Sequence, residues 1–315
     1  MTSRFLNVFF LKSPKVTDLK YKIIFRIVEL KKWLWIRKQI KKINPHLVIV
    51  SSYEPVTFSI ISHLFRVPVI AFNHNNLDEL SKNKVKAFFF KLMSKKVIHV
   101  VFEDYMKHYL KEKLKLRHKI WVLPHIAFRR AADEEALSGS KDSTRVIFFA
   151  PSGSNDKNMI ENLAKCEQAL LKKSVFIVAK FPICYSGENI ILKNYFTDDE
   201  YEQYMKISTA IFVPLEKNFN YRASNVINEG IAYGKQIITT CTKYTSFLRE
   251  NYPSLVYVVK RGLLDEIEDI VKWLEETKES FLKDRERFLK EHSEERFNEL
   301  FREYVDAVLR ELEKL

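Results

Sequence analysis

The sequence predicts an α/β protein with two domains, each built on a doubly wound parallel sheet. Short apolar runs of strand length alternate with helical patterns along most of the 315 residues, and such alternation is typical of parallel sheets. The chain is longer than one ordinary domain, and its 46% apolar content suffices for two hydrophobic cores. A polar segment at 124–144 separates the two halves and is the expected linker.

The first half is expected to alternate strands and helices from its beginning. We expect strands at 5–11, 47–51, 69–72, 97–102 and 120–123, and helices at 19–43, 56–65, 82–94 and 104–115. The apolar run at the N-terminus lacks a small-residue cleavage site, so we interpret it as a strand and not as a secretory signal. The longest hydrophobic region contains Glu54, His63 and Arg66, which excludes a membrane-spanning helix of about 20 apolar residues.

The second half repeats this alternation. We expect strands at 145–150, 175–179, 210–214 and 236–240, and helices at 159–171, 198–207 and 226–233. From 263 to 315 the pattern is almost entirely helical, with an interruption at 288–293 before a last helix at 294–315. Cys166, Cys184 and Cys241 form neither a disulfide framework nor a metal-ligand spacing, so we expect a reducing, cytoplasmic location.

The segment 196–240 has the arrangement of a site for a phosphate-bearing ligand. Its second helix begins at Ser224 or Asn225, either of which can cap it, and the N–H groups of a helix start attract anions. Arg222 adds a forked cation beside that start. Glu229 lies about one turn inside the helix, where a carboxylate can accept hydrogen bonds from ribose hydroxyls. The alternative is a capped surface helix with both charged side chains in water.

A second polar loop follows the expected strand at 145–150. Ser152 and Gly153 come directly after the strand and Lys157 comes just before a helix, so backbone N–H groups and an ammonium group converge there. Neither a Walker A motif nor the Rossmann glycine fingerprint is present. The alternative is an ordinary surface lysine after a polar turn.

The segment 196–240 resembles the donor-binding core of glycosyltransferases with the GT-B fold, especially family 4, the group 1 glycosyl transferases. An acidic helix, a strand ending in Pro214, a polar loop, a helix carrying Glu229 and the strand start Gly234-Lys235-Gln236-Ile237-Ile238 follow one another as in that family. The resemblance implies that Glu229 binds the ribose of a nucleotide sugar. It further implies a donor site made of Ser152, Gly153, Lys157, Tyr195, Phe196, Tyr221, Arg222, Ser224, Asn225 and Glu229.

The resemblance also implies the domain plan and one departure from the family. It implies two Rossmann-like domains, with acceptor-binding residues in 1–127, donor-binding residues in 128–290 and a terminal helix in 291–315 that crosses back onto the first domain. A plain helical hairpin or a coiled coil is the alternative for that C-terminal region, although sustained heptads are lacking. Tyr221 stands where the family commonly has the first of two glutamates, which usually contacts the transferred sugar.

The acceptor site is expected at the carboxyl ends of strands in the first domain, where open α/β sheets bind ligands. Asn73 and His74 follow one expected strand, and Glu54 comes after another. His74 can act as a general base or bind a sugar hydroxyl, because the ordinary pKa of histidine is near 6.5. Glu54 is the competing base. The alternative is a structural His74 and a Glu54 that only caps its helix.

Charge is distributed unevenly along the chain. Residues 1–130 contain 27 Lys and Arg against 8 Asp and Glu, whereas the remainder contains 26 against 32. The densest basic region is the helix at 19–43, which is expected to lie on an anionic membrane surface. The expected membrane contacts are Lys31, Lys32, Trp33, Trp35, Arg37 and Lys38. The alternative is an ordinary amphipathic helix packed on a sheet.

With these patterns, the resemblance implies a metal-independent glycosyltransferase of the hexosyltransferase type, with no cofactor beyond its nucleotide-sugar substrate. The donor is expected to be UDP- or GDP-linked. The expected acceptor is a membrane-linked glycan or a polyprenol carrier in bacterial surface polysaccharide synthesis, at the inner face of the plasma membrane. Alternatives are a GT-B-type nucleotide-sugar epimerase, a non-catalytic membrane-bound relative, or a basic protein that binds nucleic acid, although no nucleic-acid module is recognisable.

Overall fold

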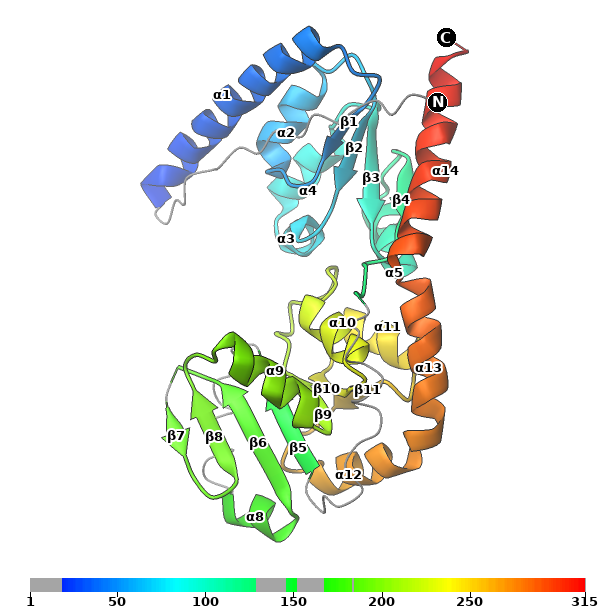
Figure 1. The fold of residues 1–315 in the computed structure, drawn as a ribbon. Coiled ribbons are helices and arrows are strands. Elements are labelled where there is room, and N and C mark those ends of the chain that lie inside the picture. The colour runs from blue at the N-terminus through cyan, green and yellow to red at the C-terminus, as the bar shows by residue number, and fades with distance from the viewer. Residues whose placement is uncertain (1–18, 129–145, 152–166, 183, 315) are drawn as a thin grey trace.

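The computed structural model describes residues 19–128, 146–151, 167–182 and 184–314. Within them the chain forms two separate sheets, one in each half, and a long C-terminal helix that runs beside the first half (Figure 1). The expected strand at 5–11 lies outside the described residues. No helix in these four segments is both long enough and apolar enough to cross a membrane.

The first sheet is entirely parallel. Its strands, in spatial order, are β1 (Val48–Val50), β2 (Val69–Phe72), β3 (Val97–Val101) and β4 (Ile120–Val122). The register pairs Val48 with Val69, and Val69 with Val97. The central strands β2 and β3 are almost continuously buried, which agrees with their high Val and Ile content.

The helices of the first half pack on one face of this sheet and share one core. They are α1 (Leu19–Ile43), α2 (Pro55–Ser62), α3 (Asn76–Lys82), α4 (Lys84–Lys91), α5 (Asp104–His108) and the π-helical turn η1 (Tyr109–Lys113). The helix expected at 82–94 is present in shorter form as α4, α3 was not expected, and the two helices are divided by Asn83. Its side chain accepts hydrogen bonds from the N–H groups of Val85 and Lys86, as an N-cap residue does.

Helix α1 has the predicted bounds, but one of its expected membrane contacts is wrong. Trp33 is only 4% exposed, and its ring packs on Phe58 at 5.0 Å and on Phe65 at 6.3 Å. The tryptophan therefore belongs to the core, because the sheet domain needs an apolar face from this helix. Lys31, Trp35 and Lys38 are exposed. Lys32 pairs with the buried Glu29, and Arg37 Nε donates to the Leu64 carbonyl.

The second sheet is doubly wound. Its strands are β5 (Val146–Ala150), β6 (Val175–Lys180), β7 (Tyr185–Ser186), β8 (Ile190–Lys193), β9 (Ala210–Val213), β10 (Gln236–Thr240) and β11 (Val256–Val259). The spatial order is β11-β10-β9-β5-β6-β8-β7, and all pairs are parallel except β7 with β8. The direction of strand order reverses between β5 and β9, and such a switch point is where open sheets bind ligands.

Helices cover both faces of the second sheet. They are α8 (Glu167–Lys172), α9 (Asp198–Ile207), α10 (Asn225–Ala232), α11 (Lys243–Asn251), α12 (Ile267–Glu276) and α13 (Lys278–Glu291). One core lies under α10, α11 and α13, and a second lies under α8 and α12. Thr197 forms a capping box with Glu200 at the start of α9, and Gly234 takes a φ of 73° after the end of α10. The start of α9 and the end of α10 therefore agree with the sequence signals.

The last helix, α14 (Glu294–Leu312), crosses back to the first domain as predicted (Figure 1). Trp121 of β4 stacks on Tyr304 at 4.9 Å, and Val308 is buried against the same face of the first sheet. The interruption expected at 288–293 is shorter in the structure. Helix α13 continues to Glu291, and its Phe288 is buried in the core under α10, α11 and α13.

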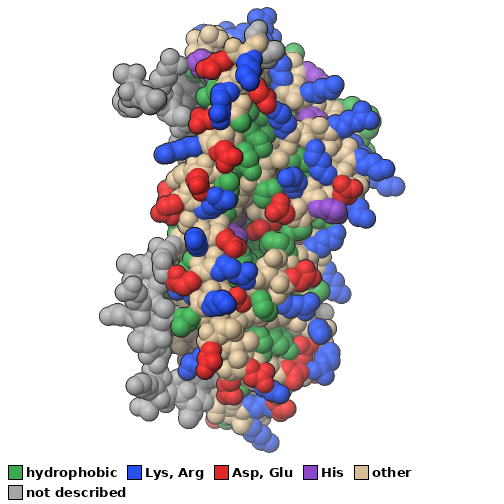
Figure 2. Space-filling view, turned by 90° about the vertical axis from the view of Figure 1, so that its right-hand side faces the viewer, with side chains coloured by type: hydrophobic (Ala, Val, Ile, Leu, Met, Phe, Trp, Pro, Cys, Tyr) green, Lys and Arg blue, Asp and Glu red, His purple; other side chains and the backbone are tan. Residues whose placement is uncertain are grey.

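The basic side chains are concentrated on the first domain, as their distribution along the sequence predicts. On the face that carries α13 and α14, acidic and basic side chains alternate, and Lys and Arg gather along the edge of the first domain at the upper right (Figure 2). Like charges spread along one edge produce a potential that attracts anionic partners.

Candidate active site

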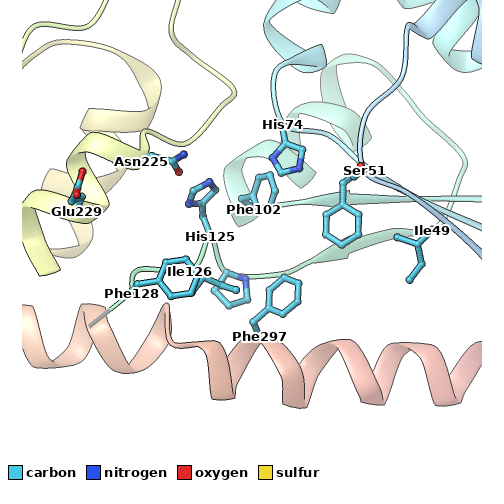
Figure 3. A pocket seen from close by; sticks show the side chains of 12 residues that line it. Ile49, Ser51, His74, Phe102, His125, Ile126, Phe128, Asn225, Glu229 and Phe297 are labelled. Atoms are coloured by element: carbon cyan, nitrogen blue, oxygen red, sulfur yellow. The ribbon is translucent and has the colours of Figure 1, made fainter. Parts of the chain in front are cut away.

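A cavity of about 520 Å³ lies between the two domains. Most of its wall comes from residues at the carboxyl ends of β1 to β4, and the opposite wall comes from α10 (Figure 3). Its lining residues are Ile49, Ser51, Phe72, His74, Phe102, Pro124, His125, Ile126, Phe128, Asn225, Glu229 and Phe297. Side chains from both domains therefore line the same cavity.

Helix α10 supplies the polar wall of the cavity. Ser224 caps it by accepting a hydrogen bond from the Ile227 N–H at 3.4 Å, so the helix starts at Asn225 beside the cavity. Glu229 lies one turn further, and its Oε2 accepts a hydrogen bond from the Tyr201 hydroxyl at 2.7 Å. Asn225 and Glu229, both expected from the sequence, thus line the same cavity. The Tyr201 partner on α9 is a contact that the sequence did not indicate.

Tyr221 and Arg222 lie elsewhere, at a contact between the domains. Asp78 of α3 accepts hydrogen bonds from the N–H groups of Asn220 at 2.9 Å and Tyr221 at 2.7 Å. Arg222 Nε lies 3.1 Å from the second oxygen of Asp78. The Tyr221 ring is 5% exposed and stacks on Tyr109 at 4.0 Å, inside the core of the first domain. Neither residue lines the cavity.

Within the described residues, none of the other expected donor-binding residues is seen in the cavity wall. Ser152, Gly153 and Lys157 lie outside the described residues, so their roles stay predictions. Phe196 is 6% exposed and packs edge-to-face on Phe149, so its assignment to the donor site is wrong and it is a core residue. Tyr195 is 63% exposed and is absent from the cavity wall.

His74 lies in the cavity wall, at the carboxyl end of β2, as predicted. Its ring lies 4.9 Å from the Phe102 ring. Partial burial lowers the pKa of His74 below its ordinary value, because the charged ring loses solvation. The neutral imidazole therefore predominates at pH 7 and can accept a proton from a hydroxyl.

The acceptor-side assignment of Asn73 is wrong, and Glu54 lies outside the cavity wall. The Asn73 side chain is fully buried, donates to the carbonyls of Ala71 and Val100, and accepts from the Tyr53 hydroxyl. A side chain enclosed in this way cannot contact a substrate. Glu54 is the N-cap of α2, where Oε2 accepts from the Thr57 N–H at 2.8 Å, and it does not line the cavity.

His125 is a cavity residue that the sequence analysis missed. Its ring lies 5.0 Å from the Phe102 ring on the side facing α10, so the two histidines flank one phenylalanine (Figure 3). Asn228 Nδ2 lies 3.0 Å from His125 Nδ1 and also donates to the His125 carbonyl. Because Asn228 Oδ1 accepts from the Tyr244 hydroxyl, Nδ1 is the acceptor and Nε2 carries the hydrogen. The turn Leu123-Pro124-His125 after a strand was the available signal.

The environment of His125 predicts a pH dependence of stability. The pKa of His125 is lowered to about 4, well below the ordinary 6.5. Burial is the main cause, and the neighbouring His74 and His292 add to it. As the pH falls, His125 therefore takes up its proton in the unfolded chain at a higher pH than in the folded protein. The contribution that neutral His125 makes to the free energy of unfolding is present above pH 6.5 and is lost as the pH falls toward 4. Each pH unit of difference between the folded and unfolded pKa corresponds to about 1.4 kcal/mol in the free energy of unfolding.

We expect His125→Gln to remove this part of the pH dependence. The difference in unfolding free energy between the parent protein and the variant should shrink from pH 7 to pH 4, as measured by urea unfolding. Groups that do not interact with His125, such as the fully buried His99, titrate equally in both proteins, so they cancel. Parallel curves for the two proteins over this range would contradict the prediction.

Among the described residues, no group of three or more His, Cys, Asp or Glu is placed to hold a metal ion. The polar groups of the cavity are two neutral imidazoles, a serine hydroxyl, the Asn225 amide and the Glu229 carboxylate. Such a set can bind hydroxyls and carry out proton transfer.

No protein-family model and no curated protein matches the sequence, but solved structures match most of the chain. Sucrose-phosphate synthase from Thermosynechococcus elongatus has a TM-score of 0.61 at 12% identity, over 90% of this chain and 79% of its own. HepE from Anabaena, in complex with UDP and glucose, also reaches 0.61, at 11% identity over 93% and 84%. A protein assigned as a UDP-N-acetylglucosamine 2-epimerase from Listeria monocytogenes reaches 0.52, at 11% identity over 82% and 74%.

These likenesses cover most of the chain and so include both domains. The narrower assignment to family 4 stays a prediction. The chain has the GT-B fold, as its resemblance to glycosyltransferases predicted.

Proposed function

We propose that the protein is a glycosyltransferase that moves a sugar from a nucleotide-diphospho-sugar to a membrane-linked acceptor. The observation that carries the proposal is the meeting of Glu229 and Asn225 from one domain with His74 from the other around one cavity. The similar HepE structure, which is in complex with UDP and glucose, supports a nucleotide-sugar donor.

The donor side uses helix α10. Glu229 accepts hydrogen bonds from the ribose, and the N–H groups at the start of α10 stabilise the charge that grows on the leaving diphosphate. We assign Lys157 to the same diphosphate, which makes a metal ion unnecessary. The pairing of Arg222 with Asp78 supports a different role for Arg222, in holding the two domains together around the donor.

The acceptor side uses His74 as the general base that deprotonates the attacking hydroxyl. Around it the wall is largely apolar, with Ile49, Phe72, Phe102 and Phe297. Apolar side chains favour an acceptor that carries hydrocarbon beside its hydroxyl groups. We therefore propose a polyprenol-linked or other lipid-linked glycan, acted on at the inner face of the plasma membrane during bacterial surface polysaccharide synthesis.

Thermal unfolding with a panel of nucleotide sugars tests the donor proposal. A UDP- or GDP-linked sugar should raise Tm, because a ligand at 100 times its Kd stabilises the folded state by about 2.7 kcal/mol. Glu229→Ala should lose this shift, and Glu250→Ala, which removes an exposed carboxylate from α11, should keep it. If neither UDP, GDP nor any of their sugars raises Tm, the proposed function is wrong.

The second candidate is a nucleotide-sugar epimerase, which the likeness to the Listeria protein supports. Both reactions use the same donor class, so Tm shifts do not separate them. Incubation of a bound nucleotide sugar without any acceptor does: an epimerase converts it to a stereoisomer, whereas a transferase requires a lipid-linked hydroxyl for turnover.

A further inference from the structure

Three helices of the first domain leave apolar side chains in solvent. On α1, Ile24 is 52% exposed, Ile27 49% and Leu34 44%, and these positions share one helix face, opposite the buried Trp33. On α4, Val85 is 60% exposed and Phe88 58%, three residues apart. Burial of the opposite side of each helix supplies the core, so these outer residues have no packing role there.

The three helices lie side by side, so their exposed residues form one surface. Arg37 Nε of α1 donates to the Leu64 carbonyl at the end of α2, at 3.4 Å. His63 Nε2 lies 2.7 Å from the Leu92 carbonyl at the end of α4. Ile60 on α2, between its two neighbours, is itself 53% exposed. We call this the α1-α2-α4 surface; it lies on the sheet face opposite α14 (Figure 1).

The charge of this surface is almost entirely positive. Helices α1 and α4 contain 12 Lys and Arg and a single acidic residue, and α2 contains no charged residue. The single acid, Glu29, is buried and paired with Lys32. Lys31 and Lys38 stand among the exposed apolar residues of α1, and Lys84 and Lys91 flank those of α4.

We propose that the α1-α2-α4 surface docks on an anionic lipid bilayer. Exposed aliphatic and aromatic side chains enter the boundary between headgroups and acyl chains, while the flexible lysines reach anionic headgroups. A second copy of the chain fits poorly, because two such basic surfaces repel each other. Nucleic acid also fits poorly, because its phosphates offer nothing to the exposed aliphatic side chains of α1 and α4.

The docking surface differs from the contacts expected from the sequence. The expected membrane contact Trp33 is buried, and α4 adds the exposed side chains of Val85 and Phe88, which the sequence analysis did not expect at a membrane. Docking also deepens the proposed function, because it brings the first domain, whose strand ends form the cavity, to the lipid that would carry the acceptor. Vesicle binding itself requires no sugar transfer, so each proposal can fail alone.

The test is sedimentation of the full chain with vesicles of phosphatidylcholine alone or mixed with phosphatidylglycerol. We expect binding to the mixed vesicles, weakened by salt, and little binding to phosphatidylcholine. Val85→Ser with Phe88→Ser should lower the partition coefficient about tenfold or more. Ile207→Ser with Leu282→Ser is the matched control, because these residues are 51% and 49% exposed in the second domain.

Each outcome of this experiment decides the proposal. Absence of binding to either vesicle, equal binding to both, or an equal loss in the control variant overturns it. A concentration-dependent dimer that the α4 variant abolishes also overturns it, in favour of a second copy. Thermal unfolding of the variants with the nucleotide sugar that binds shows that the fold and the donor site are intact.

Discussion

Replacing His74 by alanine is expected to lower kcat by about 10²- to 10⁴-fold, the usual contribution of a general base. The reason is its position: it follows β2, faces the cavity and is held neutral by partial burial, so it can take the proton of the acceptor hydroxyl. Nucleotide affinity should be unchanged, because the donor groups Asn225 and Glu229 come from the other domain. Steady-state transfer and calorimetric nucleotide binding measure the two quantities.

The matched control is His46→Ala, which removes an exposed histidine of the same domain that does not line the cavity. Its kcat should equal that of the parent protein. A His74→Ala variant with normal kcat would exclude the general-base role, and one that loses nucleotide binding together with kcat would make His74 a donor residue instead.

Tyr221→Ala is expected to lower the free energy of unfolding by about 3–5 kcal/mol, the range for removing a buried aromatic ring. The ring is 5% exposed and lies against Tyr109 and Tyr105 of the first domain, although its backbone belongs to the second. Its loss should also weaken the coupling of the domains, because it removes a large part of their apolar contact. Urea unfolding followed by circular dichroism should then show two transitions.

Tyr221→Phe is the control for this prediction. It keeps the stacked ring and removes only the hydroxyl that contacts Lys243, so it should cost much less stability. Equal losses in the two variants would contradict a packing role. Tyr221→Glu supplies the residue that the resembled family commonly has here, yet it should be the least stable of the three, because it replaces the stacked ring by a buried carboxylate.

Sequence reasoning was most successful where the signal is local. The helix at 198–207 and its Thr197 cap, the strand at 236–240 and the C′ glycine Gly234 all agree with the structure, because capping and glycine conformation depend on a few neighbouring residues. Helix α3 was missed, since its seven residues contain only two apolar side chains, too few for a helical pattern.

Long-range packing decided the rest of the candidate site. Asn73, Glu54 and Phe196 have residue types that suit a site, but their neighbours bury or engage them. In the sequence, His125 is an ordinary residue after a strand. Its tautomer and its orientation toward the cavity depend on Asn228, which is more than 100 positions away along the chain. Sequence spacing carries no information on such contacts.

By itself, the sequence determined the alternation of strands and helices, the capped start of α10 with Glu229 one turn inside, and a basic first half, because these depend on periodicity, local hydrogen bonds and composition. Only the tertiary structure decided which residues share the cavity, that Tyr221 and Arg222 join the domains, and which face of α1 is exposed. Those outcomes depend on how two domains and a returning helix pack together, where burial outweighs the preference of any single residue.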